Sequence, residues 1–154
     1  MPSTMYVYRI VLEKWSQSLT ASGQAARWNS PGRFVLYTAG SRALACLENV
    51  VHRNSRGLNQ LFKTMVIAVP DDVLVVKISE ADLPDGWHEF NNYYITQQRG
   101  DEWLDGMKSA VLVVPSAIIP AEQNFLFNVQ HPDFQKIKLV QTEDFVFDPR
   151  IKTV

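Results

Sequence analysis

Arg27, Tyr37 and Glu48 are the residues of this chain whose types and spacing suggest chemistry. The tyrosine follows the arginine by ten residues, and the glutamate follows the tyrosine by eleven. An arginine presents a planar fork that binds phosphate oxygens in pairs. A fixed carboxylate stabilises the positive charge that develops on a sugar when its glycosidic bond breaks. Together they suggest a dinucleotide substrate rather than a nucleic acid.

Each candidate also has a purely structural explanation. Glu48 lies at the edge of an apolar helical stripe, so it either snorkels at the core boundary or points into a cleft. Arg27 could form a surface ion pair, and Trp28 is more typical of a packing anchor than of a stacking platform. Ser116 follows Pro115 at the end of a buried run, where a serine commonly satisfies a turn. The stripe consists of Ala43, Leu44, Leu47, Val50 and Val51.

The elements that must position these residues are mostly short strands. Ser41 is a suitable cap for a helix over residues 41–52, and residues 91–108 form a second helical candidate interrupted by Gly100 and Gly106. Residues 58–63 favour one further helical turn, and residues 15–33 favour a loop or a short broken helix. Apolar, β-branched runs predict strands at residues 5–12, 34–37, 65–69, 73–78, 110–114, 125–127, 137–141 and 145–147. Strands outnumber helices without alternating with them, which predicts an α+β fold rather than a doubly wound sheet.

Composition describes a single globular domain over residues 1–154. Hydrophobic residues make up 46% of the chain and charged residues 20%, which argues against disorder. A net charge of −1 gives no general attraction to nucleic acid. Cys46 is the sole cysteine, and neither a signal peptide nor a membrane-spanning run is visible. We therefore expect a cytoplasmic protein with no contact to a membrane.

Several common catalytic motifs are missing from the sequence. Ser116 has no G-x-S-x-G elbow around it, which argues against a serine hydrolase. The chain has no G-x-G-x-x-G or P-loop pattern, which argues against Rossmann and Walker sites. His52, His88 and His131 lack the spacing of metal ligands, so we expect no metal.

Several short motifs follow one another along the chain. They are Tyr-Arg-Ile at 8–10, Arg-Trp-Asn-Ser-Pro-Gly at 27–32, Tyr37, Ala-Leu-Ala-Cys-Leu-Glu at 43–48, Leu-Pro-Asp-Gly-Trp at 83–87, Gly-Asp-Glu-Trp-Leu at 100–104, Val-Pro-Ser-Ala at 114–117, Asn-Phe-Leu-Phe-Asn at 124–128, His-Pro-Asp-Phe at 131–134 and Phe-Asp-Pro-Arg at 147–150. Their order resembles that of the RES-domain toxins, a family named for its arginine, glutamate and serine, whose fold resembles that of ADP-ribosyltransferases. Ala26 and Val129 depart from the family pattern, which usually has glycine before Arg-Trp and Asn-Pro before His-Pro-Asp-Phe.

The resemblance implies the toxin of a bacterial type II toxin–antitoxin system that consumes NAD. The nicotinamide–ribose bond would break by hydrolysis or phosphorolysis, with transfer of ADP-ribose to a protein as the alternative. NAD would be the substrate, and no metal would be needed. The implied catalytic residues are Arg27, Glu48 and Ser116, and the implied NAD-binding residues are Arg27, Tyr37, Asn29 and Asn128.

The resemblance also implies a partner. This is an antitoxin with a helix-turn-helix part of the Xre type, which would cover or enter the cleft. A homodimer or a toxin–antitoxin hetero-oligomer is compatible with it. Two alternatives remain at this stage: a non-catalytic interaction module, and a toxin that cuts RNA, against which the acidic pI counts.

Overall fold

The computed structural model describes residues 3–53 and 61–151. Within them the chain forms a seven-stranded mixed sheet of order β4-β5-β6-β2-β1-β3-β7, with two α-helices, which confirms the predicted α+β class. All neighbouring strands are antiparallel except β4 and β5. The strands are β1 (Thr4–Leu12), β2 (Val35–Ala39), β3 (Phe62–Pro70), β4 (Val75–Lys77), β5 (Val111–Pro115), β6 (Gln123–Asn128) and β7 (Lys138–Phe145).

The helices of the described region are α1 (Arg42–Arg53) and α2 (Tyr93–Gly106). Short 3₁₀ turns occupy Glu13–Trp15, Glu80–Asp82, Phe90–Asn92 and Pro132–Lys136. The hydroxyl of Ser41 accepts a hydrogen bond from the Leu44 N–H at 3.1 Å, so the predicted cap of α1 is confirmed. Neither helix combines the length and the apolar character that crossing a membrane requires.

Three local predictions need correction. Gly100 and Gly106 do not interrupt α2, because Gly100 faces a close neighbouring backbone and Gly106 is the last helical residue. The helical turn predicted at 58–63 is wrong for Phe62 and Lys63, which begin β3, while residues 58–60 lie outside the described residues. The predicted strand at 145–147 is also wrong: Phe145 ends β7, and the chain then leaves the sheet.

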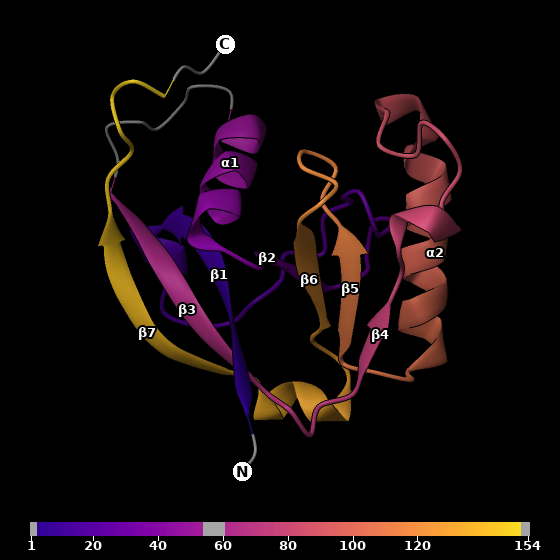
Figure 1. Cartoon of the computed structure of the whole chain (residues 1–154). Coiled ribbons are helices and arrows are strands. Elements are labelled where there is room, and N and C mark those ends of the chain that lie inside the picture. Colours follow the sequence, from indigo (N-terminus) through magenta and orange to yellow (C-terminus); the bar gives the residue numbers. More distant parts are fainter. Residues whose placement is uncertain (1–2, 54–60, 152–154) are drawn as a thin grey trace.

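One backbone pair joins the two halves of the sheet. Figure 1 shows β1, β3 and β7 on the left and β4, β5 and β6 on the right, with β2 behind them. β1 and β2 are paired only at Tyr8 and Ala39. Beyond Tyr8 the two strands part, and the guanidinium of Arg9 bridges them by donating to the Tyr37 carbonyl at 2.8 Å. This parting opens the sheet at the place where the site is found.

The middle of β5 has apolar neighbours on both faces. Val111 and Val113 join a cluster with residues of β1 and β3, whereas Leu112 and Val114 join a cluster with α2. Alternation along a strand sends successive side chains to opposite faces, and a strand covered on both faces is apolar throughout. All five residues of β5 are buried accordingly. The strand thus holds Ser116, which follows it, in a fixed position.

α1 packs through its first turns onto β1, β2 and β3. Leu44 and Ala45 share an apolar cluster with Ile10, Ala39 and Phe62. Residues three and four apart lie on one side of a helix. Glu48 is therefore on the packed side of α1, one turn beyond the buried residues and at the opening between the strands.

Candidate functional site

A cleft of about 1020 Å³ lies where β1 and β2 separate. Its walls come from the second half of β1, from β2, from one side of α1 and from the loop that precedes β2. Phe62 of β3, Tyr93 of α2, Ala117 and Asn124 complete the lining. This volume is at the upper end of the range for small-molecule and cofactor sites.

Glu48 and Ser116 meet in this part of the molecule. The Ser116 hydroxyl donates to Glu48 Oε1 at 3.3 Å, and it accepts hydrogen bonds from the backbone N–H groups of Ile118 and Ile119 at 3.1 and 3.2 Å. Ser116 is fully buried, while the Glu48 side chain keeps 25% of its surface exposed. Of the two interpretations of Glu48, the structure supports the one that points it into a cleft.

The second carboxylate oxygen of Glu48 lies beside an exposed histidine. His52, one turn further along α1, places its Nε2 3.6 Å from Glu48 Oε2. The imidazole is 69% exposed, and His52 is among the cleft-lining residues. One carboxylate oxygen is thus bound by a buried serine, while the other lies beside the exposed imidazole.

Arg27 enters the cleft from the loop before β2 and stacks on Tyr93. The guanidinium carbon lies 4.5 Å from the centre of the tyrosine ring. Its Nη1 is buried and has no hydrogen-bond partner among the described residues. Among the described residues no carboxylate lies within ion-pair distance of Arg27. The surface ion pair considered from the sequence is therefore not formed there. A stacked guanidinium with unused donors suits an anionic ligand.

Asn29 holds the Arg27 loop in shape. Its amide nitrogen donates to the carbonyls of Gln24, Ser30 and Arg33 at 2.9, 3.1 and 3.3 Å. Its Oδ1 accepts from the Tyr37 hydroxyl at 2.6 Å, and the side chain is 1% exposed. Both ends of the amide are therefore used within the protein.

α2 supports the same loop from outside. Thr96 Oγ1 donates to the Arg27 carbonyl at 2.6 Å. A Cβ placed on Gly100 would lie 1.6 Å from the Trp28 carbonyl oxygen, so only glycine permits this approach. Trp28 is 2% exposed and packs beside Trp87, which confirms its expected role as an anchor.

Tyr37 lines the cleft with its ring, but its hydroxyl serves the loop. The hydroxyl accepts from the Trp28 N–H at 3.0 Å while it donates to Asn29. Burial, the largest cause, raises the pKa of Tyr37 far above its ordinary value. The group is therefore a neutral hydrogen-bond donor throughout the physiological range.

Arg9 is a second cation in the cleft, and the sequence reasoning missed it. It lies in the middle of β1, lines the cleft, and has a pKa lowered by burial. Among the described residues it forms no ion pair, and its one hydrogen bond goes to the Tyr37 carbonyl. Its sequence signal was a lone charge inside an otherwise apolar and aromatic strand.

The structure does not bring all predicted site residues together. Arg27, Tyr37 and Glu48 line the cleft, and Ser116 lies directly behind Glu48. Asn29 lies within its loop, and Asn128 lies at the far end of β6, where its amide contacts Met107 Sδ and the Gln130 N–H. Neither asparagine is part of the cleft lining. The lining residues that sequence reasoning did not select include Arg9, Asn49, Tyr93 and Asn124.

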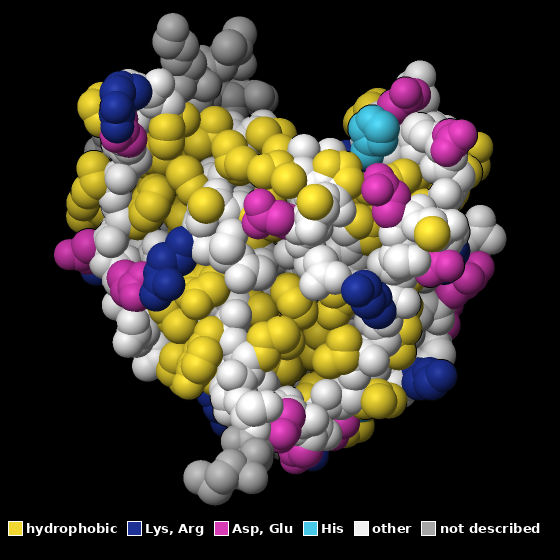
Figure 2. All heavy atoms as spheres, viewed as in Figure 1, with side chains coloured by type: hydrophobic (Ala, Val, Ile, Leu, Met, Phe, Trp, Pro, Cys, Tyr) yellow, Lys and Arg dark blue, Asp and Glu magenta, His cyan; other side chains and the backbone are white. Residues whose placement is uncertain are grey.

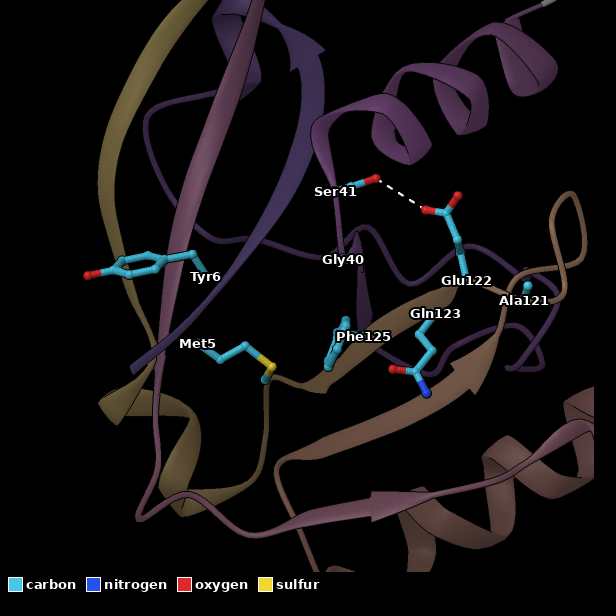
Figure 3. Close-up of a pocket in the computed structure, with 8 residues that line it drawn as sticks. All are labelled: Met5, Tyr6, Gly40, Ser41, Ala121, Glu122, Gln123 and Phe125. Carbon is cyan, nitrogen blue, oxygen red and sulfur yellow. Dashed lines mark hydrogen bonds between the residues drawn. The ribbon is translucent and has the colours of Figure 1, made fainter. Parts of the chain in front are cut away.

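A second, smaller hollow of about 270 Å³ lies between β1 and β6 at the start of α1. Figure 3 shows Met5 and Phe125 side by side among its lining residues and Glu122 accepting a hydrogen bond from Ser41 at 3.3 Å. Figure 2 shows that hydrophobic side chains gather on this face of the molecule. Its lining contains one acidic residue and no cation, so we place the candidate site in the larger cleft.

The described residues contain no group of three or more histidine, cysteine, aspartate or glutamate side chains that could hold a metal ion. His52 is the one histidine among the cleft-lining residues. His131 instead caps a 3₁₀ turn, because its Nδ1 accepts from the Asp133 N–H at 3.0 Å. Glu48 with its hydrogen-bonded Ser116, His52 and the two arginines are polar groups that the structure places in or beside the cleft.

Comparison with known proteins gives consistent results. The chain is 41% identical over 127 residues to a Prs ADP-ribosylating toxin of Sphingobium sp., which covers 81% of this chain and 79% of that protein. It is 35% identical over 154 residues to a Toxin Res of Yersinia enterocolitica, and the match covers 96% of this chain and 100% of that protein. In fold it matches a chain of the crystal structure of the M. tuberculosis MbcT-MbcA toxin-antitoxin complex, with a TM-score of 0.77 at 18% identity over 95% of this chain and 86% of that one.

The family model described as RES domain matches residues 6–148, which include most of β1, the Arg27 loop, α1 and the serine that follows β5. The extent of this match and the identity to the toxins above confirm the family expected from the short motifs. The chain belongs to the RES domain family of toxins.

Proposed function

We propose that this protein is the toxin of a toxin–antitoxin system and that it cleaves the nicotinamide–ribose bond of NAD. One observation carries the proposal. A carboxylate braced by a buried serine shares a cleft of about 1020 Å³ with two arginines, neither of which is paired with a carboxylate among the described residues. That arrangement suits a ligand with a polyanionic part and a sugar that becomes cationic.

Glu48 is the proposed catalytic residue. Breaking the N-glycosidic bond builds positive charge on the ribose, as in other glycosyl cleavages. A carboxylate held at a fixed place beside that sugar stabilises the charge without having to reorganise during the reaction. The hydrogen bond from Ser116 sets the position of Oε1, while Oε2, which lies 3.6 Å from His52 Nε2, would meet a ribose hydroxyl or the cation. Ser116 is thus a positioning residue in this proposal.

Arg27 and Arg9 are the proposed binding groups for the pyrophosphate. Unpaired buried charge is unfavourable, and an anionic ligand would relieve it. Arg27 is oriented by the Tyr93 ring, and its buried Nη1 is a donor without a protein acceptor in the described chain. The ring of Tyr37 would pack against the nicotinamide ribose, because its hydroxyl is already used by the loop. Asn29 and Asn128 lie outside the cleft lining, so in this proposal neither contacts NAD, and Asn29 supports binding through the shape of the Arg27 loop.

A strong general acid is not required in this mechanism. The nicotinamide of NAD carries a positive charge and leaves as a neutral molecule, so no proton has to reach it. Water, inorganic phosphate or a protein side chain would then capture the sugar carbon. The name of the Sphingobium relative, an ADP-ribosylating toxin, supports transfer of ADP-ribose to a protein as the alternative to hydrolysis or phosphorolysis.

We further propose that an antitoxin of the Xre type covers the cleft in the cytoplasm. The likeness in fold to a chain of a toxin–antitoxin complex supports an antitoxin as partner. A non-catalytic interaction module is the competing explanation. It does not account for a buried serine donating to a carboxylate inside a cleft with two unpaired arginines.

The test is NAD loss with purified protein, with and without inorganic phosphate, followed by identification of the product. ADP-ribose identifies hydrolysis, and its phosphorylated form identifies phosphorolysis. If NAD is stable in both buffers, radiolabelled NAD is added together with a cell lysate, and a labelled protein identifies transfer. The absence of all three products would contradict the proposed activity, and intact RNA in the same lysate excludes the RNA-cutting alternative.

A further inference from the structure

Asn49 follows Glu48 on α1 and lines the same cleft, yet the mechanism above gives it no role. Its amide nitrogen donates to the Ile10 carbonyl of β1 at 2.9 Å. Its Oδ1 is buried and accepts no hydrogen bond from any described residue. Buried polar atoms in folded proteins are nearly always paired, so a lone acceptor in a cleft needs an explanation.

The hydrogen bond to β1 fixes which end of the amide is unpaired. Rotating the side chain by half a turn would place Oδ1 against the carbonyl of Ile10, and two acceptors repel each other. The nitrogen must therefore face β1, and the oxygen must face away from it. The missing partner is a hydrogen-bond donor.

The surroundings of Asn49 restrict the kind of ligand that can supply this donor. Six cleft-lining residues belong to the apolar cluster between α1 and the sheet: Tyr8, Ile10, Leu12, Ala39, Ala45 and Phe62. A phosphate or a sugar beside them would leave several polar groups without partners, which is unfavourable. A flat heteroaromatic ring that carries one nitrogen donor group would bury its faces against these side chains. An N–H of that group would then donate to Asn49 Oδ1.

We propose that Asn49 is a specificity residue that accepts a hydrogen bond from the amino group of such a ring. The inference rests on the proposed function, because NAD supplies two groups of this chemistry: the amino group of adenine and the carboxamide nitrogen of nicotinamide. Since Oδ1 is covered, binding requires a small displacement of the side chains around it. Glu48 and Asn49 then contact two parts of one ligand.

Two analogues of NAD separate the two sources. Nicotinamide hypoxanthine dinucleotide replaces the adenine amino group with oxygen, and acetylpyridine adenine dinucleotide replaces the carboxamide nitrogen with a methyl group. Stopped-flow quenching of tryptophan fluorescence gives Kd before turnover, because Trp15 and Trp28 line the cleft. We expect wild-type protein to bind one analogue about 5- to 100-fold more weakly than NAD. The analogue affected identifies the ring.

Asn49→Leu is the test variant, with Asn124→Leu as its matched control. Asn124 also lines the cleft, and its amide likewise donates to a backbone carbonyl, that of Thr38 at 3.2 Å. In Asn49→Leu we expect the Kd values for NAD and for the affected analogue to come within about twofold of each other. We expect Asn124→Leu to keep the wild-type ratio between the Kd values for NAD and for the affected analogue. A purely structural loss would weaken all three ligands in parallel and preserve their ratios.

Equal binding of the three dinucleotides to wild-type protein overturns the inference without any variant. A difference that persists in folded Asn49→Leu also overturns it. If Asn49→Leu does not fold, Asn49→Ser takes its place with the same expected ratios. Failure of wild-type protein to bind NAD at all contradicts the proposed function itself, whereas NAD binding without discrimination contradicts the role of Asn49 alone.

Discussion

The hydroxyl of Ser116 lies 3.3 Å from Glu48 Oε1, although the two residues are 68 positions apart in the sequence. The same hydroxyl accepts hydrogen bonds from the N–H groups of Ile118 and Ile119, so its proton is directed to the carboxylate. The turn after β5 thus orients the serine, and the serine orients the glutamate. This relationship links the fold to the proposed chemistry.

Ser116→Ala removes that orientation. We expect kcat for NAD loss to fall about 10- to 100-fold, because small misplacements of a catalytic group are costly. Ser109→Ala is the matched control: Ser109 is equally buried just before β5, where it donates to the Val111 carbonyl. The control should lower the thermal midpoint and leave kcat unchanged. A wild-type rate in folded Ser116→Ala would contradict the positioning role.

Gly100→Ala should displace the Arg27 loop. The new Cβ would meet the Trp28 carbonyl, which is backbone and cannot move aside cheaply. We expect a higher KM for NAD and a lower midpoint of thermal unfolding. Gly106→Ala, in the same helix, has open space at its Cβ and should be neutral or stabilising by about 0.5–1 kcal/mol. Equal effects of the two variants on KM would refute this account of the loop.

Tyr93→Ala removes the ring beneath the Arg27 guanidinium. Cation–π contacts contribute about 0.5–2 kcal/mol, so KM for NAD should rise about 2- to 30-fold. Tyr94→Ala serves as the control, because Tyr94 is 66% exposed and does not line the cleft. Kinetics over a range of NAD concentrations separate KM from kcat. An unchanged KM in Tyr93→Ala would show that the stack does not prepare Arg27 for binding.

Tyr37 gives the fold a dependence on alkaline pH. Its folded pKa is raised above the ordinary 10.0, chiefly by burial, and the phenol is neutral when protonated. Its contribution to the free energy of unfolding is therefore complete below about pH 10 and is lost as the pH rises further. Urea unfolding of wild type and Tyr37→Phe from about pH 8 to about pH 11 tests this. The stability of the variant should fall less steeply over the alkaline end of that range; parallel curves would contradict the prediction.

The sequence was most informative where the signal is local. The β-branched run of β1, the Ser41 cap and the edge position of Glu48 on α1 each depend on residues within a few positions of one another. The predicted interruption of α2 was wrong. Glycine is needed at position 100 because the backbone of Trp28, far away in sequence, packs directly against it. Propensity alone cannot report a tertiary contact of that kind.

The site was predictable only where its residues are marked by local sequence patterns. The types of Arg27, Glu48 and Ser116 point to chemistry, but their meeting depends on strand pairings between segments far apart in the sequence, β2 with β6 and β6 with β5. Arg9 was marked only by its lone charge within an apolar and aromatic strand, and the place of Tyr93 beneath Arg27 depends on a contact between residues far apart in the sequence. Asn29 shows the opposite case: a polar residue in a functional motif whose hydrogen bonds all serve the loop.

The most direct test of NAD cleavage centred on Glu48 compares wild-type protein with Glu48→Gln under identical conditions. The substitution keeps the size of the side chain and removes the charge that would stabilise the ribose cation. We predict that the rate of NAD loss falls by a factor of about 10²–10³ or more while the circular dichroism spectrum and thermal midpoint stay unchanged. Glu143→Gln, which breaks a surface pair with Arg42, should keep the wild-type rate. A folded Glu48→Gln protein that consumes NAD as fast as wild type would contradict the account.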